Sequence, residues 1–222
     1  AQAGPVFRRE VIDSKVIGGR DLDIADVDGD GRSDVVLADK WRFAWYENPG
    51  WQDRTLARNI TLRDNICIAA RDIDGDGRAE IAVGSRWNPS NTTERLASGS
   101  VHYLDRPGDP RQEWSPVELF HDPTVHRMRW VRGADGRYRL VVLPLHGIGN
   151  HDGEGPNGVN VRVYEPNLIW LSQPRGWSHR VIDRSLHRAH GFDSESGVLF
   201  IGGTEGIVRR YLTDGRNCDA LI

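Results

Sequence analysis

The chain consists of short runs in which β-branched and aromatic residues alternate with polar ones, and each run ends at a turn rich in glycine or proline. Alternation with a period of two is typical of β-strands with one buried face. No sustained 3.6-residue periodicity predicts a helix. The 25 glycines and 11 prolines separate the runs at regular intervals. The pattern therefore predicts an all-β chain of many short strands.

The runs recur in four sets along the chain. Inner strands are expected before tight turns, at residues 20–27, 66–73, 126–132 and 187–193. Second strands follow those turns, at 31–39, 77–85, 136–144 and, more loosely, 197–203. Third strands are expected at 42–49, 100–107, 160–166 and 207–212. Outer strands follow only three of these, at 51–58, 114–121 and 177–183.

The missing outer strand has a counterpart at the start of the chain. Phe7-Arg-Arg-Glu-Val-Ile-Asp13 resembles Ser178-His-Arg-Val-Ile-Asp183 of the outer set. We therefore expect one domain, residues 1–222, that forms a four-bladed β-propeller of four-stranded antiparallel sheets, with the ring closed by the N-terminal strand. The expected blades are 15–58, 59–122, 123–185, and 186–215 completed by 6–14. A β-sandwich is the alternative, but it does not explain why the first strand resembles the outer set.

Two of the turns repeat an acidic pattern, Asp-x-Asp-Gly-Asp-Gly-Arg-x-acid. Glycines let such a loop curl, so that carboxylates at positions one, three, five and nine and a backbone carbonyl at position seven face one point. Oxygen cages of this kind suit Ca²⁺, and the alternative is a polar hairpin without metal. The predicted ligands are Asp26, Asp28, Asp30, Arg32 and Asp34 in the first loop and Asp72, Asp74, Asp76, Arg78 and Glu80 in the second.

The other two turns depart from this pattern. Val131, Gly133 and Ala134 replace acidic or glycine positions in the third repeat, and the fourth turn, Ser194-Glu-Ser-Gly197, is shortened. We expect no metal there. No nucleophile elbow or glycine-rich phosphate loop is present, so the sequence predicts two structural Ca²⁺ sites and no organic cofactor.

These motifs resemble a known group of repeats. The Asp-Gly-Asp-Gly-Arg loops, Trp45-Tyr-Glu-Asn-Pro-Gly50 and His126-Arg-Met-Arg-Trp130 are similar to FG-GAP or VCBS-type propeller repeats, which occur in integrin heads and in secreted bacterial and fungal proteins. Within that group they look most like the propellers of aldos-2-ulose dehydratase and of some polysaccharide lyases. The resemblance implies a calcium-binding propeller and a saccharide-directed activity of the lyase type.

Successive strands alternate in direction, so the acidic loops gather at one end of the sheets and the remaining turns at the other. The second end carries five of the eight histidines and the two long loops, 85–99 and 145–158. Long loops over a channel can form a cleft. The candidate catalytic residues there are His126, His146, His151, His187, His190, Arg63, Arg127 and Arg129. The candidate ligand-binding residues are Arg20, Trp41, Arg86, Trp87, Asn150 and Glu205.

This end of the chain supports hypotheses of different classes. In a lyase or dehydratase, His126 or His187 would remove a proton beside a carbonyl with an apparent pKa of about 6 to 7, and arginines would stabilise the enolate. In a lectin-like or adhesive propeller, Trp41, Trp87 and the arginines would hold a ligand without turnover. A cofactor-independent cyclase or isomerase is the third class. The ordinary structural alternatives are histidines that hydrogen-bond neighbouring blades and indoles that pack between blades.

The charge, the apolar runs and the cysteine content limit the classes of binding partner that the sequence allows. The 29 basic and 32 acidic residues give a net charge of −3, without the basic face that nucleic acid requires. No run of 18 apolar residues predicts a membrane span. Ala1-Gln2-Ala3-Gly4 looks like the end left by signal-peptide cleavage, so we expect a secreted or periplasmic protein with a small-molecule or saccharide ligand. Cys67 and Cys218 are expected to be a core thiol and a tail thiol.

Overall fold

The computed structural model describes residues 4, 7–152 and 154–212, and this part of the chain is all-β as predicted. Fifteen strands form four antiparallel sheets in which chain neighbours pair in order. The described non-strand elements are two 3₁₀ turns, η1 (Arg95–Ala97) and η2 (Pro174–Gly176). Among the described residues no helix is long and apolar enough to cross a membrane.

Strand bounds agree closely with the four predicted sets. Sheet one contains β1 (Asp21–Ala25), β2 (Asp34–Ala38), β3 (Arg42–Glu47) and β4 (Gln52–Arg58). Sheet two contains β5 (Cys67–Arg71), β6 (Glu80–Gly84), β7 (Val101–Asp105) and β8 (Ser115–Leu119). Sheet three contains β9 (Val125–Arg132), β10 (Tyr138–Pro144), β11 (Val161–Glu165) and β12 (Ser178–Asp183). Sheet four contains β13 (Ala189–Glu195), β14 (Val198–Gly203) and β15 (Gly206–Tyr211).

The sheets pack face to face through three apolar clusters. Because side chains alternate along a strand, each inner sheet presents one row of apolar residues to the sheet before it and another to the sheet after it. Sheets one and two meet through Val36, Trp45, Ile68 and Ile81. Sheets two and three meet through Ala82, Tyr103, Met128 and Tyr164. Sheets three and four meet through Val141, Val163, Leu199 and Ile201.

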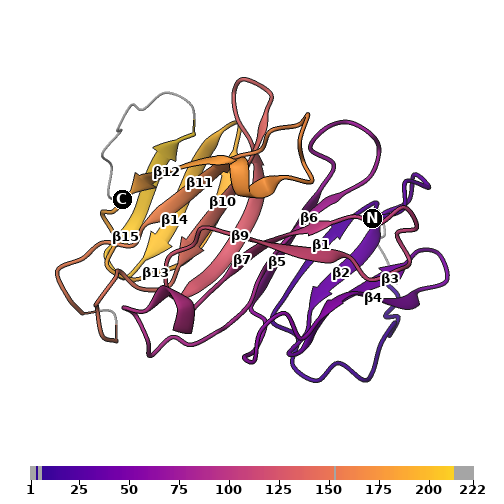
Figure 1. The fold of residues 1–222 in the computed structure, drawn as a ribbon, viewed down its shortest axis with the longest axis horizontal. Coiled ribbons are helices and arrows are strands. Elements are labelled where there is room, and N and C mark those ends of the chain that lie inside the picture. Colours follow the sequence, from indigo (N-terminus) through magenta and orange to yellow (C-terminus); the bar gives the residue numbers. More distant parts are fainter. Residues whose placement is uncertain (1–3, 5–6, 153, 213–222) are drawn as a thin grey trace.

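Figure 1 shows the four sheets in a row rather than a closed ring, with sheet one (indigo) and sheet four (yellow) at opposite ends of the longest axis. Contacts between neighbouring sheets run from β1 to β5, from β5 to β9, and from β9 and β10 to β13. The outer faces of the two end sheets expose apolar side chains, including Leu22 and Ile24 on β1 and Phe200 on β14. The arrangement is therefore an open propeller-type arc.

The prediction that the N-terminal segment closes the ring is wrong for the described residues. Residues 7–20 form no strand, and the Phe7 side chain is 90% exposed. The segment lies instead against sheet one, where the Tyr46 hydroxyl donates a hydrogen bond to Asp13 Oδ2 at 2.6 Å. Among the described residues sheet four has three strands, because sheet one, which holds this segment, does not reach it.

Cys67 is a free thiol, fully buried in β5, as expected. Burial raises the pKa of this thiol, so it is an inert core side chain. Gly84 lies opposite Cys67 in the β5–β6 pair, and a Cβ atom added there would lie 2.5 Å from the sulfur, so the thiol fills the space beside this glycine. Cys218 lies outside the described residues.

Two leucines test whether the inter-sheet clusters stabilise the fold. Leu104 is fully buried between sheets one and two, whereas Leu62 is 99% exposed. We expect Leu104→Ala to lower the free energy of unfolding by about 2–5 kcal/mol in urea titrations, because it removes buried methyl groups and leaves a cavity. The same change at Leu62 should cost less than about 0.5 kcal/mol. Equal losses at the two positions would contradict this packing.

Candidate functional site

The two acidic loops, residues 26–34 and 72–80, share one backbone conformation at the same end of sheets one and two. In the first loop, Gly29 and Gly31 have φ angles of 81° and 84°, which a residue with a Cβ adopts only under strain. The Asp26 carboxylate accepts hydrogen bonds from both of their N–H groups, at 2.7 and 2.8 Å. Asp72 accepts the equivalent bonds in the second loop. These bonds curl each loop around its own carboxylates.

Each loop gathers three carboxylates. Oxygens of Asp26, Asp28 and Asp34 lie within 4.8 Å of one another, and so do oxygens of Asp72, Asp74 and Glu80. The ninth-position acids, Asp34 and Glu80, are 1% and 2% exposed. Burial raises the pKa of both, and that of Glu80 to about 7. Desolvated carboxylates facing like charges are what a bound divalent cation would compensate, so these residues fit Ca²⁺.

The fifth-position acids lie outside these triads. Asp30 Oδ1 accepts the Arg32 N–H at 2.8 Å, and Asp76 Oδ1 accepts the Arg78 N–H at the same distance. Arg106 Nη2 also donates to Asp76 Oδ2 at 2.7 Å. Three of the four acids predicted in each loop are therefore brought together by the structure.

The third turn is built differently. Asp135 forms a bidentate ion pair with Arg139, with bonds of 2.9 and 2.8 Å, and this lowers the pKa of the Asp135 carboxyl. Within the part of the chain that the structure describes, a group of three potential metal ligands forms only in the first two loops.

At the opposite end, the structure brings three predicted residues from different sheets into contact. The His126 ring on β9 stacks on Trp87, which follows β6, with ring centroids 5.2 Å apart. It also meets His190 of β13 edge to face at 4.7 Å. Only 6% of His126 is exposed, and its Nε2 has no hydrogen-bond partner among the described residues. His126 is thus the centre of an aromatic cluster, whereas His190 is exposed.

Burial, Arg127 and the neighbouring histidines lower the pKa of His126 to about 3. Its imidazole is therefore neutral at neutral pH, but it is too weak a base to match the expected pKa of 6 to 7. That expectation does not hold for His126. Burial also lowers the pKa of His146, which is 7% exposed and forms a backbone bridge with Arg188.

His187 has the arrangement of a general base. Its Nδ1 lies 2.7 Å from Glu205 Oε1, which also accepts the His187 backbone N–H at 2.8 Å. Thr204 donates to the other carboxylate oxygen at 2.9 Å. Desolvation opposes ionisation of Glu205, but these hydrogen bonds outweigh it and lower the pKa of the carboxyl. A carboxylate on Nδ1 leaves Nε2 as the proton acceptor.

Most of the predicted arginines already have partners. Arg129 pairs with Asp21 at 3.2 Å, Arg86 with Glu118 at 3.1 Å, and Arg20 with Asp64 at 2.9 Å. Arg127 donates to the His126 carbonyl at 3.0 Å. These contacts hold strands and turns together, which is a structural role. The charge-stabilising role expected for Arg127 and Arg129 has no support in this geometry.

The other predicted residues are spread over this end. Asn150 is fully buried and fastens its loop by donating to the Asn157 carbonyl at 2.6 Å, so it is not placed to bind a ligand. Trp41 is 41% exposed, with Lys40 Nζ 5.1 Å from its ring centroid. Arg63 lies exposed on the turn before β5, and exposed His151 borders a small cavity beside Pro89.

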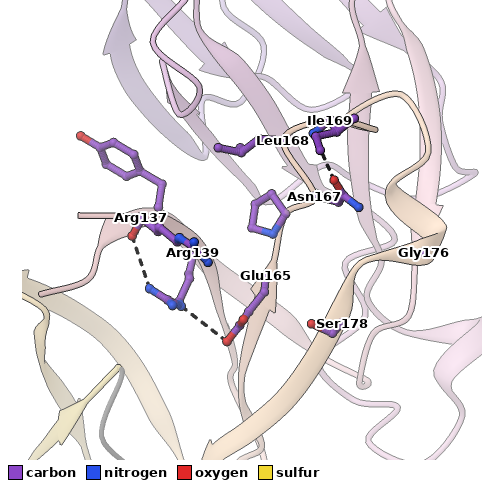
Figure 2. Close-up of a pocket in the computed structure, with 10 residues that line it drawn as sticks. Arg137, Arg139, Glu165, Asn167, Leu168, Ile169, Gly176 and Ser178 are labelled. Carbon is purple, nitrogen blue, oxygen red and sulfur yellow. Dashed lines mark hydrogen bonds and ion pairs between the residues drawn. The ribbon is translucent and has the colours of Figure 1, made fainter. Parts of the chain in front are cut away.

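Two larger hollows were not foreseen. One, of about 520 Å³, lies on sheet four beside His190 and is floored by glycines. The other, of about 500 Å³, lies at the acidic-loop end of sheet three (Figure 2). In the second, Arg139 Nε lies 3.5 Å from Glu165 Oε1, and Leu168 and Ile169 cover the opposite wall. The exposed apolar run 168–170 was the available sequence signal.

A buried histidine that sequence reasoning also missed lies on β7. His102 is 5% exposed, and burial lowers its pKa to about 4. It lies opposite Glu118 of β8 in the strand register. His102 and His126 are thus kept neutral inside the fold, although free histidine has a pKa of about 6.5.

These two histidines predict a loss of stability in acid. Below pH 6.5 the unfolded chain binds protons on both, whereas the folded chain does so only near pH 3 to 4, so stability is lost as pH falls between these values. At pH 5 each should cost about 2 kcal/mol relative to pH 7.5. Urea titrations at the two pH values measure this. Because Glu80, with a pKa raised to about 7, contributes in the opposite direction, the His102→Gln variant is titrated beside the wild type. A pH-dependent loss that is the same in both chains would contradict the burial of the His102 ring.

Comparison with known proteins finds a family match over part of the chain. Residues 26–83 match a family described as FG-GAP-like repeat, which covers the first acidic loop through to β6. A search of curated proteins found no match. Among solved structures, a chain of "Crystal structure of Nidogen/Laminin Complex" aligns over 90% of this chain and 78% of its own length, with 12% identity and a TM-score of 0.34. Residues 26–83 are thus similar to an FG-GAP-like repeat, and the four successive antiparallel sheets are consistent with a β-propeller built from such repeats.

Proposed function

We propose that this chain is a calcium-binding propeller module of a secreted or periplasmic protein, which binds a saccharide or another small ligand at the end that carries the histidines. The observation that carries the proposal is the pair of carboxylate triads, Asp26, Asp28, Asp34 and Asp72, Asp74, Glu80. Both triads occupy the same place in the repeat and have the same local hydrogen bonds. A polar hairpin without metal does not require two buried acids.

Within each triad the residues have distinct parts. Asp26 and Asp28, or Asp72 and Asp74, would offer oxygens from the curled loop, and the backbone carbonyl at Arg32 or Arg78 would add one. The buried acid would fix the loop to the following strand, since Asp34 accepts N–H groups of Val27 and Asn48 at 3.0 and 2.8 Å. A bound Ca²⁺ would neutralise these charges and stabilise the turn. This role is structural and separate from any chemistry at the other end.

Calcium should therefore raise the stability of the protein. At ten times the dissociation constant, one site adds about 1.4 kcal/mol by mass action. We expect a higher melting temperature with Ca²⁺ than with chelator, and the double variant Asp28→Asn, Asp74→Asn should lose this difference. Asp152→Asn, an exposed acid at the opposite end, is the matched control. Calorimetric titration that detects no Ca²⁺ binding to the wild-type chain would refute the proposal.

A second candidate function is a lyase or dehydratase, and the His187–Glu205 pair favours it. His187 would take a proton from carbon beside a carbonyl onto Nε2, while Glu205 stabilises the resulting imidazolium. The side chain of His187 is 41% exposed, so a ligand can reach it. Trp87 and His126 supply an aromatic cluster, and the exposed indole of Trp41 offers a flat surface on which a sugar ring stacks.

Turnover and binding separate the two candidates. We expect His187→Gln to lower turnover of uronate or 2-keto sugar substrates, followed by absorbance of the unsaturated product, by on the order of a hundredfold. Ligand affinity should be unchanged, and His179→Gln, on the outer strand β12, should leave both unaffected. If the wild-type chain binds a saccharide without turnover, the binding function stands and the lyase is excluded. If it neither binds nor turns over any saccharide, the ligand assignment itself is wrong.

A further inference from the structure

The outer face of sheet one carries apolar side chains at positions that are buried between two sheets elsewhere in the molecule. The strand registers place Leu22 and Ile24 of β1 at the positions that Ile68 and Ala70 occupy in β5. Ile68 and Ala70 are 0% and 1% exposed because they pack against sheet one. Leu22 and Ile24 are 54% and 55% exposed. Sheet one is therefore built to pack against a preceding sheet of the same kind.

The outer face of sheet four corresponds to the face of sheet three that packs against the following sheet. Phe200 and Ile207 stand at the positions of Val141 and Val161 in sheet three, both of which are fully buried against sheet four. Phe200 and Ile207 are 39% and 46% exposed. Gly191 and Gly202 leave the hollow of about 520 Å³ beside Ile207. This face is built to receive a following sheet.

A carboxylate on sheet four repeats the contact that joins the inner strands elsewhere. Asp23 of β1 accepts the Ile24 N–H on Oδ1 at 2.8 Å, and its Oδ2 accepts the Ala70 N–H of the next sheet at 3.0 Å. Asp193 holds the equivalent register position on β13 and accepts the Ser194 N–H on Oδ1 at 2.8 Å. In a following sheet one the Ile24 N–H already donates to Asp23 of its own chain, so the second oxygen of Asp193 would share this donor with Asp23.

Within the described residues sheet four has no outer strand, and one segment of the outer type does not serve as a strand. Residues 7–13 match the outer strand β12 in sequence, yet they lie without strand structure beside sheet one. If residues 7–13 are aligned on β12, Glu10 takes the place of Arg180. Arg180 lies opposite Val163 of β11, and in sheet four Arg209 of β15 holds the position of Val163. Glu10 would then face Arg209, whose Nε is buried without a partner among the described residues.

We propose that two copies of this chain associate head to tail, with sheet one of each against sheet four of the other and residues 7–13 of each pairing as the fourth strand with β15 of the other. This arrangement buries both exposed end faces of each copy. A head-to-tail contact forms a closed ring when the rotation that relates one copy to the next returns to the first copy. Two arcs make a ring of eight sheets, which is the upper end of the usual propeller range, whereas three arcs would exceed it.

Solution mass and a pair of variants test the head-to-tail contact. We expect sedimentation velocity to show a dimer, and Ile24→Asp or Phe200→Asp each to give monomers, with Ile169→Asp, exposed elsewhere, as the control. Mixing the two variants should restore dimers, because one of the two contacts is then free of substitutions. A monomeric wild-type chain overturns the proposal. Loss of dimer with Ile24→Asp alone, while Phe200→Asp remains dimeric, indicates sheet one on sheet one and also overturns it.

A disulfide tests the exchanged strand. In a Cys218→Ser background, Glu10→Cys with Arg209→Cys should form covalent dimers that a non-reducing gel resolves, and either cysteine alone should not. A disulfide within one chain would mean that the segment closes its own ring, and this would overturn the exchange. Failure to form any disulfide while the wild-type protein is dimeric would overturn the strand pairing but keep the face-to-face contact.

Discussion

The fold depends on one constraint, which is that each sheet has two apolar faces and needs a neighbour on both. An isolated antiparallel sheet commonly buries one face and exposes the other. Here sheets two and three bury both faces, through rows such as Ile68 and Ile81 on one side and Ala82 and Tyr103 on the other. Stacking along the chain follows from this, since each repeat can bury its faces only against the repeats before and after it. The exposed faces at the two ends follow from the same constraint.

The inner strands add a polar constraint to the apolar one. The edge of β5 next to β1 presents N–H groups that have no strand partner, and Asp21 and Asp23 accept hydrogen bonds from Ile68 and Ala70 there. Arg129 reaches Asp21 from β9, so one carboxylate contacts two neighbouring sheets. Side chains thus satisfy backbone groups that a further strand would otherwise pair. Arginines on the inner strands, such as Arg129, therefore have a structural role and are not free to bind a ligand.

Much of the fold could be predicted because its signals are local. The strand sets, the turns and the curled acidic loops depend on residues within about ten positions of one another. Ring closure could not be predicted in the same way. The likeness of residues 7–13 to 178–183 identifies a type of strand, but its partner depends on where sheet four lies relative to sheet one. The pKa of His126 is equally non-local, because Trp87 and His190 come from other sheets.

The ion pair between Asp135 and Arg139 has a consequence for the two halves of the chain. In the third turn the positive charge is a guanidinium on a neighbouring strand, covalently part of the protein and always present. In the first two turns Arg111 Nη2 lies 3.5 Å from Asp28 and Arg106 Nη2 lies 3.9 Å from Glu80, but each triad holds three carboxylates, so the further balancing cation would come from solution. The first half would therefore respond to the ionic medium, and the second half would not. Where the cation is scarce, opening would begin at sheets one and two while sheet three kept its own counter-charge.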